Sequence, residues 1–85
     1  MLTSWHESAW ADYLWWQTQD KKTLRRINAL IQDTQRNGYK TAGKPEPLRG
    51  VLAGWWSVRI DSEHRLVFAL RDGTPEIHQC RGHYA

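Results

Sequence analysis

The spacing of apolar residues changes once along this 85-residue chain, and that change limits the possible folds more than any other feature. Before residue 38, apolar side chains recur with the spacing of helices, and after residue 54 they alternate as in strands. Glycines and prolines interrupt both patterns in between. We therefore expect one α+β domain, residues 1–85, in which two N-terminal helices pack on one face of a small antiparallel β-sheet.

The first predicted helix begins at Glu7, after a short apolar segment, Leu2–Trp5, that is compatible with a strand. Asp12 is expected to face away from the core. The residues expected on the buried face have helical spacing: Ala9, Trp10, Tyr13, Leu14 and Gln17.

A second helix is predicted from Asp20, a suitable N-cap, to Asn37-Gly38, a typical C-terminal stop. The residues expected inside follow the i, i+3, i+4, i+7 spacing: Leu24, Ile27, Leu30, Ile31 and Thr34. Its basic residues, Arg25 and Arg26 among them, are expected elsewhere on its surface. The two segments predict an antiparallel helical hairpin whose apolar stripe packs on the sheet.

Three strands and two connections are predicted in the second half of the chain: strands at 55–60, 64–70 and 76–81, with turns at 61–63 and 71–75. Alternation turns Leu66 and Phe68 toward the helices, which leaves Arg65 on the opposite face. The same rule places Arg59 on that opposite face. In the last strand, alternation places Ile77 on the same face as His83, although Ile77 resembles a core residue. A β-bulge within this strand could therefore move the residues after it to the other face of the sheet.

The composition excludes several classes of protein. Cys80 is the only cysteine, so an intramolecular disulfide is impossible, and no segment has the pattern of a signal peptide or the length of a membrane span. We therefore expect a cytoplasmic protein without a membrane partner.

The net charge of +3 and the pI of about 9.4 favour an anionic partner. Six tryptophans are too many for so small a core, so some are expected at a partner surface or along a half-exposed rim.

Three clusters carry side chains suited to attack on an RNA phosphodiester: residues 44–48, 59–65 and 80–84. Cleavage by the internal 2′-hydroxyl needs a base, a cation for the phosphorane oxygens and an acid for the leaving 5′-oxygen. Glu46 is the candidate base, because the prolines on both sides restrict its backbone. Arg65 is the candidate cation, since a guanidinium keeps its charge and binds phosphate oxygens in pairs. His83 is the candidate acid, because imidazole delivers protons near neutral pH.

Each assignment has an alternative. Glu46 could be a solvated residue of a stiff turn, and Arg65 could form a surface ion pair with Glu63 or Asp61. A terminal histidine such as His83 could simply be exposed. Tyr84, next to it, could stack on an unpaired base or pack the edge of the domain.

A metal centre is a further alternative, because His78, Cys80 and His83 lie close together in the sequence and His64 could lie next to them across a strand. Alternation places His78 and Cys80 on the face opposite His83 unless a bulge intervenes. No paired Cys-x-x-Cys or His-Glu-x-x-His motif occurs, so no metal site is expected.

The three clusters together resemble the YoeB toxins, within the RelE-like superfamily. The motifs that carry the likeness are Lys44-Pro45-Glu46-Pro47-Leu48, the run from Arg59 to Phe68, and Cys80-Arg81-Gly82-His83-Tyr84. Residues 5–20 and 27–34 look similar too, so the resemblance covers essentially the whole chain. It implies the RelE-like microbial RNase fold for the single domain, residues 1–85.

The resemblance also implies a function. Such toxins are metal-independent endoribonucleases that cleave messenger RNA on the ribosome, leave a 5′-hydroxyl and a cyclic or terminal 3′-phosphate, and need no cofactor. The implied partners are a YefM-like antitoxin, whose flexible C-terminal segment wraps and inhibits the toxin, the ribosome with its mRNA, and a second copy in a homodimer.

By motif matching, Glu46 takes the family's general-base position, Arg65 its phosphate-stabilising position and His83 its general-acid position. The other matched positions are expected to bind RNA: Lys44, Arg49, Arg59 and Tyr84. Glu63 and Arg81 are expected to support the site, Glu63 by orienting Arg65 or His83.

Four positions depart from the family's pattern. Arg49 stands where lysine is typical, and Val58 replaces a frequent arginine, which lowers the expected affinity for RNA or the ribosome. Gly82 replaces a bulkier residue, which could loosen His83, and Ala85 extends beyond the tyrosine that usually ends the chain. Gly82 and Ala85 keep open a non-catalytic RNA- or antitoxin-binding module with the same fold, although the presence of Glu46, Arg65 and His83 together argues against it. A third hypothesis, metal-dependent hydrolysis, predicts that chelation abolishes activity.

Overall fold

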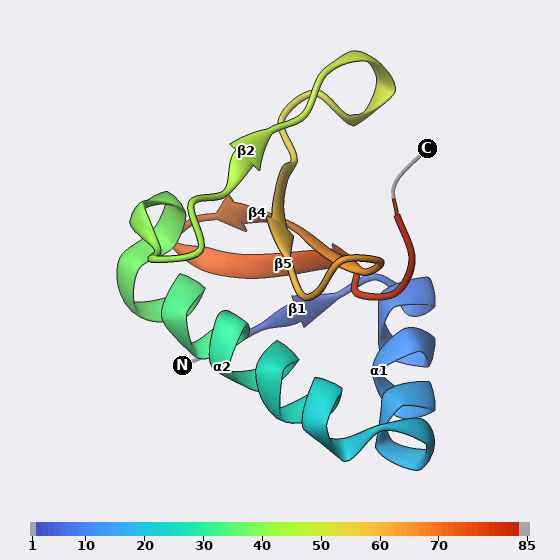
Figure 1. Cartoon of the computed structure of the whole chain (residues 1–85). Helices are drawn as coiled ribbons and strands as arrows, with labels where there is room; N and C mark the ends of the chain where they lie inside the picture. Colours follow the sequence, from blue (N-terminus) through green and yellow to red (C-terminus); the bar gives the residue numbers. More distant parts are fainter. Residues whose placement is uncertain (1, 84–85) are drawn as a thin grey trace.

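The computed structural model describes residues 2–83 and has the expected α+β architecture, with two α-helices packed on one face of a five-stranded sheet (Figure 1). The helices are α1 (Glu7–Gln19) and α2 (Lys21–Asn37). The strands are β1 (Ser4–Trp5), β2 (Glu46–Pro47), β3 (Trp56–Arg59), β4 (Arg65–Arg71) and β5 (Thr74–Gln79), and short 3₁₀ helices lie at Gly38–Lys40 and Gly50–Leu52. Within residues 2–83 no helix is long and apolar enough to cross a membrane.

The strands lie in the order β1-β5-β4-β3-β2. The pairs from β2 to β5 are antiparallel, as predicted, whereas β1 pairs parallel to β5. The β2 strand was not predicted, because a two-residue strand is too short to show an alternating pattern. The predicted turn at 71–75 was too long: Asp72 and Gly73 alone form it, both with positive φ angles (53° and 79°), which is the backbone of a tight hairpin turn.

The α2 helix forms as predicted. One carboxylate oxygen of Asp20 accepts hydrogen bonds from the backbone N–H groups of Lys22 (3.1 Å) and Thr23 (3.2 Å), and the other accepts one from the Thr23 hydroxyl (2.7 Å). These bonds, with that of the Thr23 hydroxyl foremost, hold the pKa of Asp20 below its usual value. The buried residues of the helix are those expected from its spacing: Ile27, Leu30, Ile31 and Thr34.

The predicted buried face of α1 is confirmed at Ala9 and at Tyr13, which packs against the core, but it is wrong at Trp10, Leu14 and Gln17. Trp10 and Leu14 remain 45% and 43% exposed, while Ala9 and Trp16 are buried. The helix turns Trp16 inward because its indole N–H donates to the carbonyl oxygen of Cys80 at 2.9 Å. Asp12, expected to face outward, lies on the same side and is only half exposed.

The hydrophobic core lies between the sheet and the two helices. Leu66 and Phe68 are buried there, as predicted, together with Val58. A bulge in β5 determines which face of the sheet the last residues of this strand point to. Val67 lies opposite Gln79, but Phe68 lies opposite Ile77, so His78 is the extra residue. Ile77 can therefore enter the core while Gln79 turns to the other face, which is the change of face that the sequence pattern suggested.

Candidate active site

The antiparallel register brings three of the predicted site residues to one face of the sheet. Glu46 lies opposite Ser57, and Arg59, two residues along β3 from Ser57, lies opposite Arg65. These side chains line a hollow of about 350 Å³, and the complete lining is Arg26, Gly43, Lys44, Glu46, Ser57, Arg59 and Arg65. This hollow is the candidate active site.

Glu46 reaches the hollow from a short edge strand. Only two residues of β2 pair with β3, and the backbone N–H of Leu48 adds one more hydrogen bond, to the carbonyl oxygen of Trp55 at 2.9 Å. Pro47 is compatible with this position because an edge strand leaves one row of backbone groups unpaired. The Glu46 side chain is exposed, so its carboxylate is open to a ligand.

Arg59 and Arg65 are directly opposed on neighbouring strands. Like charges in this position destabilise a sheet, so the pair favours an anion between the two guanidinium groups. The alternative of a surface ion pair for Arg65 does not occur among the described residues: Glu63 instead lies 3.2 Å from Nε2 of His64. Glu63 therefore contacts a different neighbour from the one expected.

Ser57 contributes a buried hydroxyl to the lining of the hollow. The residue is 1% exposed, and its Oγ has no hydrogen-bond partner among residues 2–83. A buried hydroxyl without a partner is costly to the folded state. Ser57 is thus a buried polar group of the hollow whose hydroxyl has no partner in the part of the chain that the structure describes.

The C-terminal segment, residues 80–83, is tied to the body of the domain. The backbone N–H of Arg65 donates to the carbonyl oxygen of Gly82 at 3.0 Å, and the Gly82 N–H donates to Nδ1 of His64 at 2.8 Å. The Gln79 amide donates to the carbonyl oxygens of Arg81 and Gly82. These bonds hold the backbone on both sides of Gly82, whose φ of 77° suits glycine.

His83 directly follows this anchored glycine. Because the Gly82 carbonyl is bonded to the first residue of β4, the chain delivers His83 next to the backbone of Arg65. The imidazole is exposed. Tyr84, predicted to bind RNA, lies outside the described residues.

His64 is a neutral hydrogen-bond acceptor at Nδ1, because that nitrogen receives the Gly82 N–H. Its proton is then on Nε2, facing the carboxylate of Glu63. The ring also packs edge-on against Trp16, with centroids 4.8 Å apart. The sequence pattern pointed to His64 only as a neighbour of the candidate metal ligands, and its bond to Gly82 was not predicted because this partner lies 18 residues away in the chain.

Cys80 is unsuited to bind a metal. It is fully buried, and burial first, then the nearby Asp12, raises the pKa of its thiol to about 12. The sulfur therefore stays protonated and contacts the carbonyl oxygen of Ala9 at 3.6 Å. Within residues 2–83 no group of three or more His, Cys, Asp or Glu side chains is arranged to hold a metal ion.

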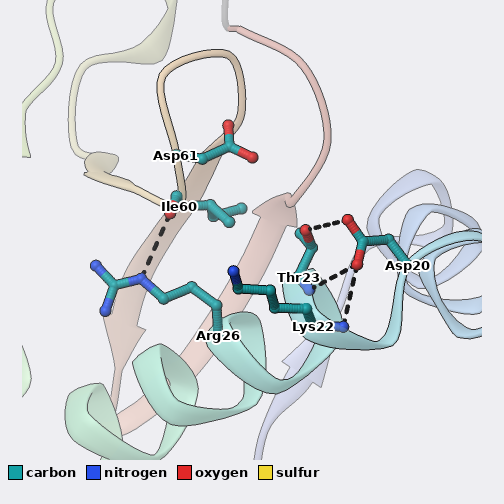
Figure 2. A pocket seen from close by; sticks show the side chains of 6 residues that line it. All are labelled: Asp20, Lys22, Thr23, Arg26, Ile60 and Asp61. Atoms are coloured by element: carbon teal, nitrogen blue, oxygen red, sulfur yellow. Dashed lines mark hydrogen bonds between the residues drawn. The ribbon is translucent and has the colours of Figure 1, made fainter.

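A second hollow, of about 390 Å³, lies at the start of α2 (Figure 2). Its lining is Asp20, Lys22, Thr23, Arg26, Ile60 and Asp61. Asp20 already occupies the free N–H groups of the helix N-terminus, so those groups are not available to an anion. The hollow is less suited to phosphate than the one at Arg59 and Arg65, because it contains two carboxylates.

Two of the predicted residues, Arg49 and Arg81, do not line the hollow. Arg49 is exposed at the residue before the second 3₁₀ helix and does not line the hollow. Arg81 places its guanidinium 4.1 Å from the ring centre of Trp15, so it anchors the C-terminal segment to α1. Conversely, Arg26 lines the site although the sequence pattern placed it elsewhere on α2.

Comparison with known proteins identifies the family. Residues 5–84 match the family described as the YoeB-like toxin of the bacterial type II toxin-antitoxin system. Toxin YoeB of Escherichia coli strain K12 is 51% identical over 84 residues, which is 99% of this chain and 100% of that protein.

Two solved structures from Staphylococcus aureus have the same fold. A YoeB-YefM complex matches with a TM-score of 0.92 and 38% identity, covering 99% of this chain and 98% of that chain. A YoeB dimer matches with a TM-score of 0.89 and 39% identity, at the same coverage of both chains. On the family match and the full-length identity, the chain belongs to the YoeB-like toxins of bacterial type II toxin-antitoxin systems.

Proposed function

We propose that this protein is a metal-independent endoribonuclease that cleaves messenger RNA on the translating ribosome and so inhibits translation. The observation that carries the proposal is the hollow in which Glu46, Arg59 and Arg65 lie together. Its position beside the anchored C-terminal segment supports a role for His83 in the same reaction.

In the proposed reaction, the Glu46 carboxylate takes the proton of the 2′-hydroxyl, and the 2′-oxygen attacks the adjacent phosphorus. Arg65 and Arg59 stabilise the negative charge that builds on the non-bridging oxygens. The bond from phosphorus to the 5′-oxygen breaks, and protonated His83 gives its proton to that oxygen. The products are a 2′,3′-cyclic phosphate and a 5′-hydroxyl, without a metal or cofactor.

The proposed macromolecular partners follow from the relatives. A YefM-like antitoxin is proposed because the S. aureus relative is solved as a YoeB-YefM complex, and a homodimer because another is solved as a dimer. The net charge of +3 suits an acidic antitoxin segment as well as RNA. The reaction is proposed to occur in the cytoplasm, where ribosomes translate.

The test is cleavage of a defined mRNA on translating ribosomes, mapped by primer extension. The parent protein is expected to produce new 5′ ends. Glu46→Ala and His83→Ala are each expected to slow cleavage by about two to four orders of magnitude, the usual contribution of a catalytic acid or base. Arg65→Ala is expected to slow it by about two to three orders of magnitude, the usual cost of removing a donor that stabilises transition-state charge. Glu7→Ala and Arg36→Ala, two exposed charges of the helices, are the matched controls.

Two further measurements separate the proposal from its alternatives. A 2′-deoxy substitution at the cleaved nucleotide is expected to abolish cleavage, and treatment of the protein with a chelator before the assay is expected to change nothing. A parent protein that binds ribosomes but yields no new 5′ ends would make it a binding module. Full activity in all three variants would show that the assigned roles are wrong.

A further inference from the structure

We propose that Arg26 of α2 binds a second phosphate of the RNA strand, beside the scissile phosphate held by Arg59 and Arg65. This inference rests on the proposed nuclease function and adds a phosphate-binding subsite to it. Arg26 belongs to a helix, whereas the other cations of the hollow come from the sheet and from the segment that leads to β2.

The position of Arg26 carries the inference. Its side chain lines the candidate active site together with Lys44, Arg59 and Arg65. Its Nε–H group donates to the carbonyl oxygen of Ile60 at 3.4 Å, which directs the guanidinium toward the end of β3. Figure 2 shows the two terminal nitrogens of Arg26 pointing away from Asp20 and Asp61. These nitrogens are therefore left to bind a ligand at the hollow.

The charge of the hollow fits more than one phosphate. Its lining contains the four cations Arg26, Lys44, Arg59 and Arg65 and one carboxylate, Glu46. None of the ion pairs among residues 2–83 involves Arg26. One phosphodiester carries one negative charge, so the opposed pair Arg59 and Arg65 is sufficient for the scissile group. A strand that crosses the hollow must bring the next phosphate too, and Arg26 offers it a two-pronged donor.

The chain supplies a matched control for this inference. Arg25 is the neighbouring residue on α2, has the same charge, is exposed, and lines neither of the two hollows. Arg26→Gln and Arg25→Gln therefore change the net charge equally. Any general effect of charge on binding to the ribosome or the RNA will appear in both variants.

The first experiment measures kcat/KM for mRNA cleavage on translating ribosomes. Arg26→Gln is expected to lower kcat/KM about tenfold, because the loss of one charge-assisted hydrogen bond changes a rate or binding constant by about this factor. Arg25→Gln is expected to stay within about twofold of the parent. Thermal melting of both variants checks that they are folded. If the two variants are equally active, the inference is wrong; if the parent protein does not cleave at all, the proposed function itself has failed.

The second experiment leaves the protein folded as it is and changes the RNA. A neutral methylphosphonate replaces the phosphate on one or the other side of the scissile position. The parent protein is expected to lose about tenfold in kcat/KM at one of these two positions, and Arg26→Gln is expected to lose no more at that position. Equal further losses in the parent and in Arg26→Gln would overturn the inference.

An acidic peptide is the alternative ligand for Arg26. Binding of a polyglutamate peptide to the parent, Arg26→Gln and Arg25→Gln proteins tests this by fluorescence anisotropy. If Arg26→Gln weakened peptide binding selectively while its cleavage of RNA matched that of Arg25→Gln, Arg26 would be a contact for an acidic protein segment and not for RNA.

Discussion

Residues 41–47, which carry Glu46, combine a turn of their own backbone with pairing to the nearby strand β3, whereas residues 80–83, which lead to His83, are held by groups that lie far away in the sequence. In the first segment Lys44 has a positive φ of 53°, and its N–H donates to the carbonyl oxygen of Thr41. In the second, the Cys80 carbonyl accepts from Trp16, which is 64 residues away in the sequence. The proposed base is thus placed by a local turn and by the neighbouring strand β3, and the proposed acid by contacts with segments that lie far away in the sequence.

This difference predicts different responses to mutation. Substitutions that alter a local backbone constraint in residues 41–47 should move Glu46 while the helix-side core stays intact. A substitution at Trp16, the anchor of residues 80–83 that is also a core residue, should affect the proposed acid and the stability together. Trp16 is both 4% exposed and bonded to Cys80.

The largest effect is expected for Trp16→Ala. Removal of a buried tryptophan should lower the free energy of unfolding by about 3–5 kcal/mol. Trp16→Phe keeps most of the packing but removes the indole N–H, which leaves the Cys80 carbonyl without its partner and should cost about 1–3 kcal/mol. Urea unfolding measures both values, and mRNA cleavage by Trp16→Phe reports the effect on His83.

Trp15→Phe is the control for this prediction. Trp15 is the adjacent residue, is 38% exposed and contacts Arg81 instead of the Cys80 carbonyl. We expect it to change the stability by less than about 1 kcal/mol, the upper range for an exposed cation–π contact. If Trp15→Phe and Trp16→Phe had equal effects on stability and cleavage, the bond from Trp16 to Cys80 would not be the anchor.

A smaller effect on stability, with a large effect on activity, is expected for Gly43→Ala. A Cβ atom at Gly43 would lie 2.6 Å from Cγ2 of Val58, a buried side chain of β3 that cannot move aside. The substitution should push residues 41–47 away from β3 and cost about 1–3 kcal/mol, as overpacking does. Because Lys44 and Glu46 move with the segment, cleavage should fall further than the loss of stability explains.

Val58→Ala, introduced alone and together with Gly43→Ala, tests the cause of this effect. Since the methyl groups of Val58 create the clash, the two substitutions should be coupled, and the double variant should regain part of the cleavage lost in Gly43→Ala. Coupling of neighbouring residues typically amounts to about 0.5–3 kcal/mol. Strictly additive effects would mean that Gly43 is needed for another reason.

The same contrast explains what could be predicted from the sequence. The α2 helix was predictable because its cap, Asp20, and its apolar positions are local signals that agree with one another. The bulge in β5 was predictable because Ile77 resembles a core residue and yet has the parity of His83 in its strand. Each of these signals lies within a few residues of the feature that it predicts.

The features that were missed depend on contacts between distant segments. The choice of Trp16 over Trp10 as the buried tryptophan of α1 is made by the Cys80 carbonyl, which the spacing within the helix does not contain. Arg25 and Arg26 are adjacent residues of the same type, and the packing of α2 beside the end of β3 makes Arg26 the one that lines the hollow. No local pattern distinguishes such pairs.

The smallest predicted effect concerns Asp12, which faces the start of the C-terminal segment from α1. Burial raises the pKa of its carboxyl above the usual 3.8, while the backbone N–H of Cys80 and the Arg81 guanidinium act in the opposite direction. A raised pKa means that the folded state binds the proton more tightly than the unfolded state does. Ionisation of Asp12 therefore lowers the free energy of unfolding. This loss grows as the pH rises from below 3.8 through the pKa of the folded state, and at higher pH it is constant.

Asp12→Asn removes this ionisation and keeps an oxygen that can accept the Cys80 N–H. The variant is expected to be slightly more stable than the parent at pH 7, with the difference shrinking as the pH falls through the folded pKa and vanishing below about 3.8, the unfolded value. Urea unfolding across this pH range measures both curves. If Asp12→Asn were instead less stable at pH 7, the attraction of Asp12 to Cys80 and Arg81 would outweigh its burial, and the carboxylate would be one more long-range anchor of the segment that leads to His83.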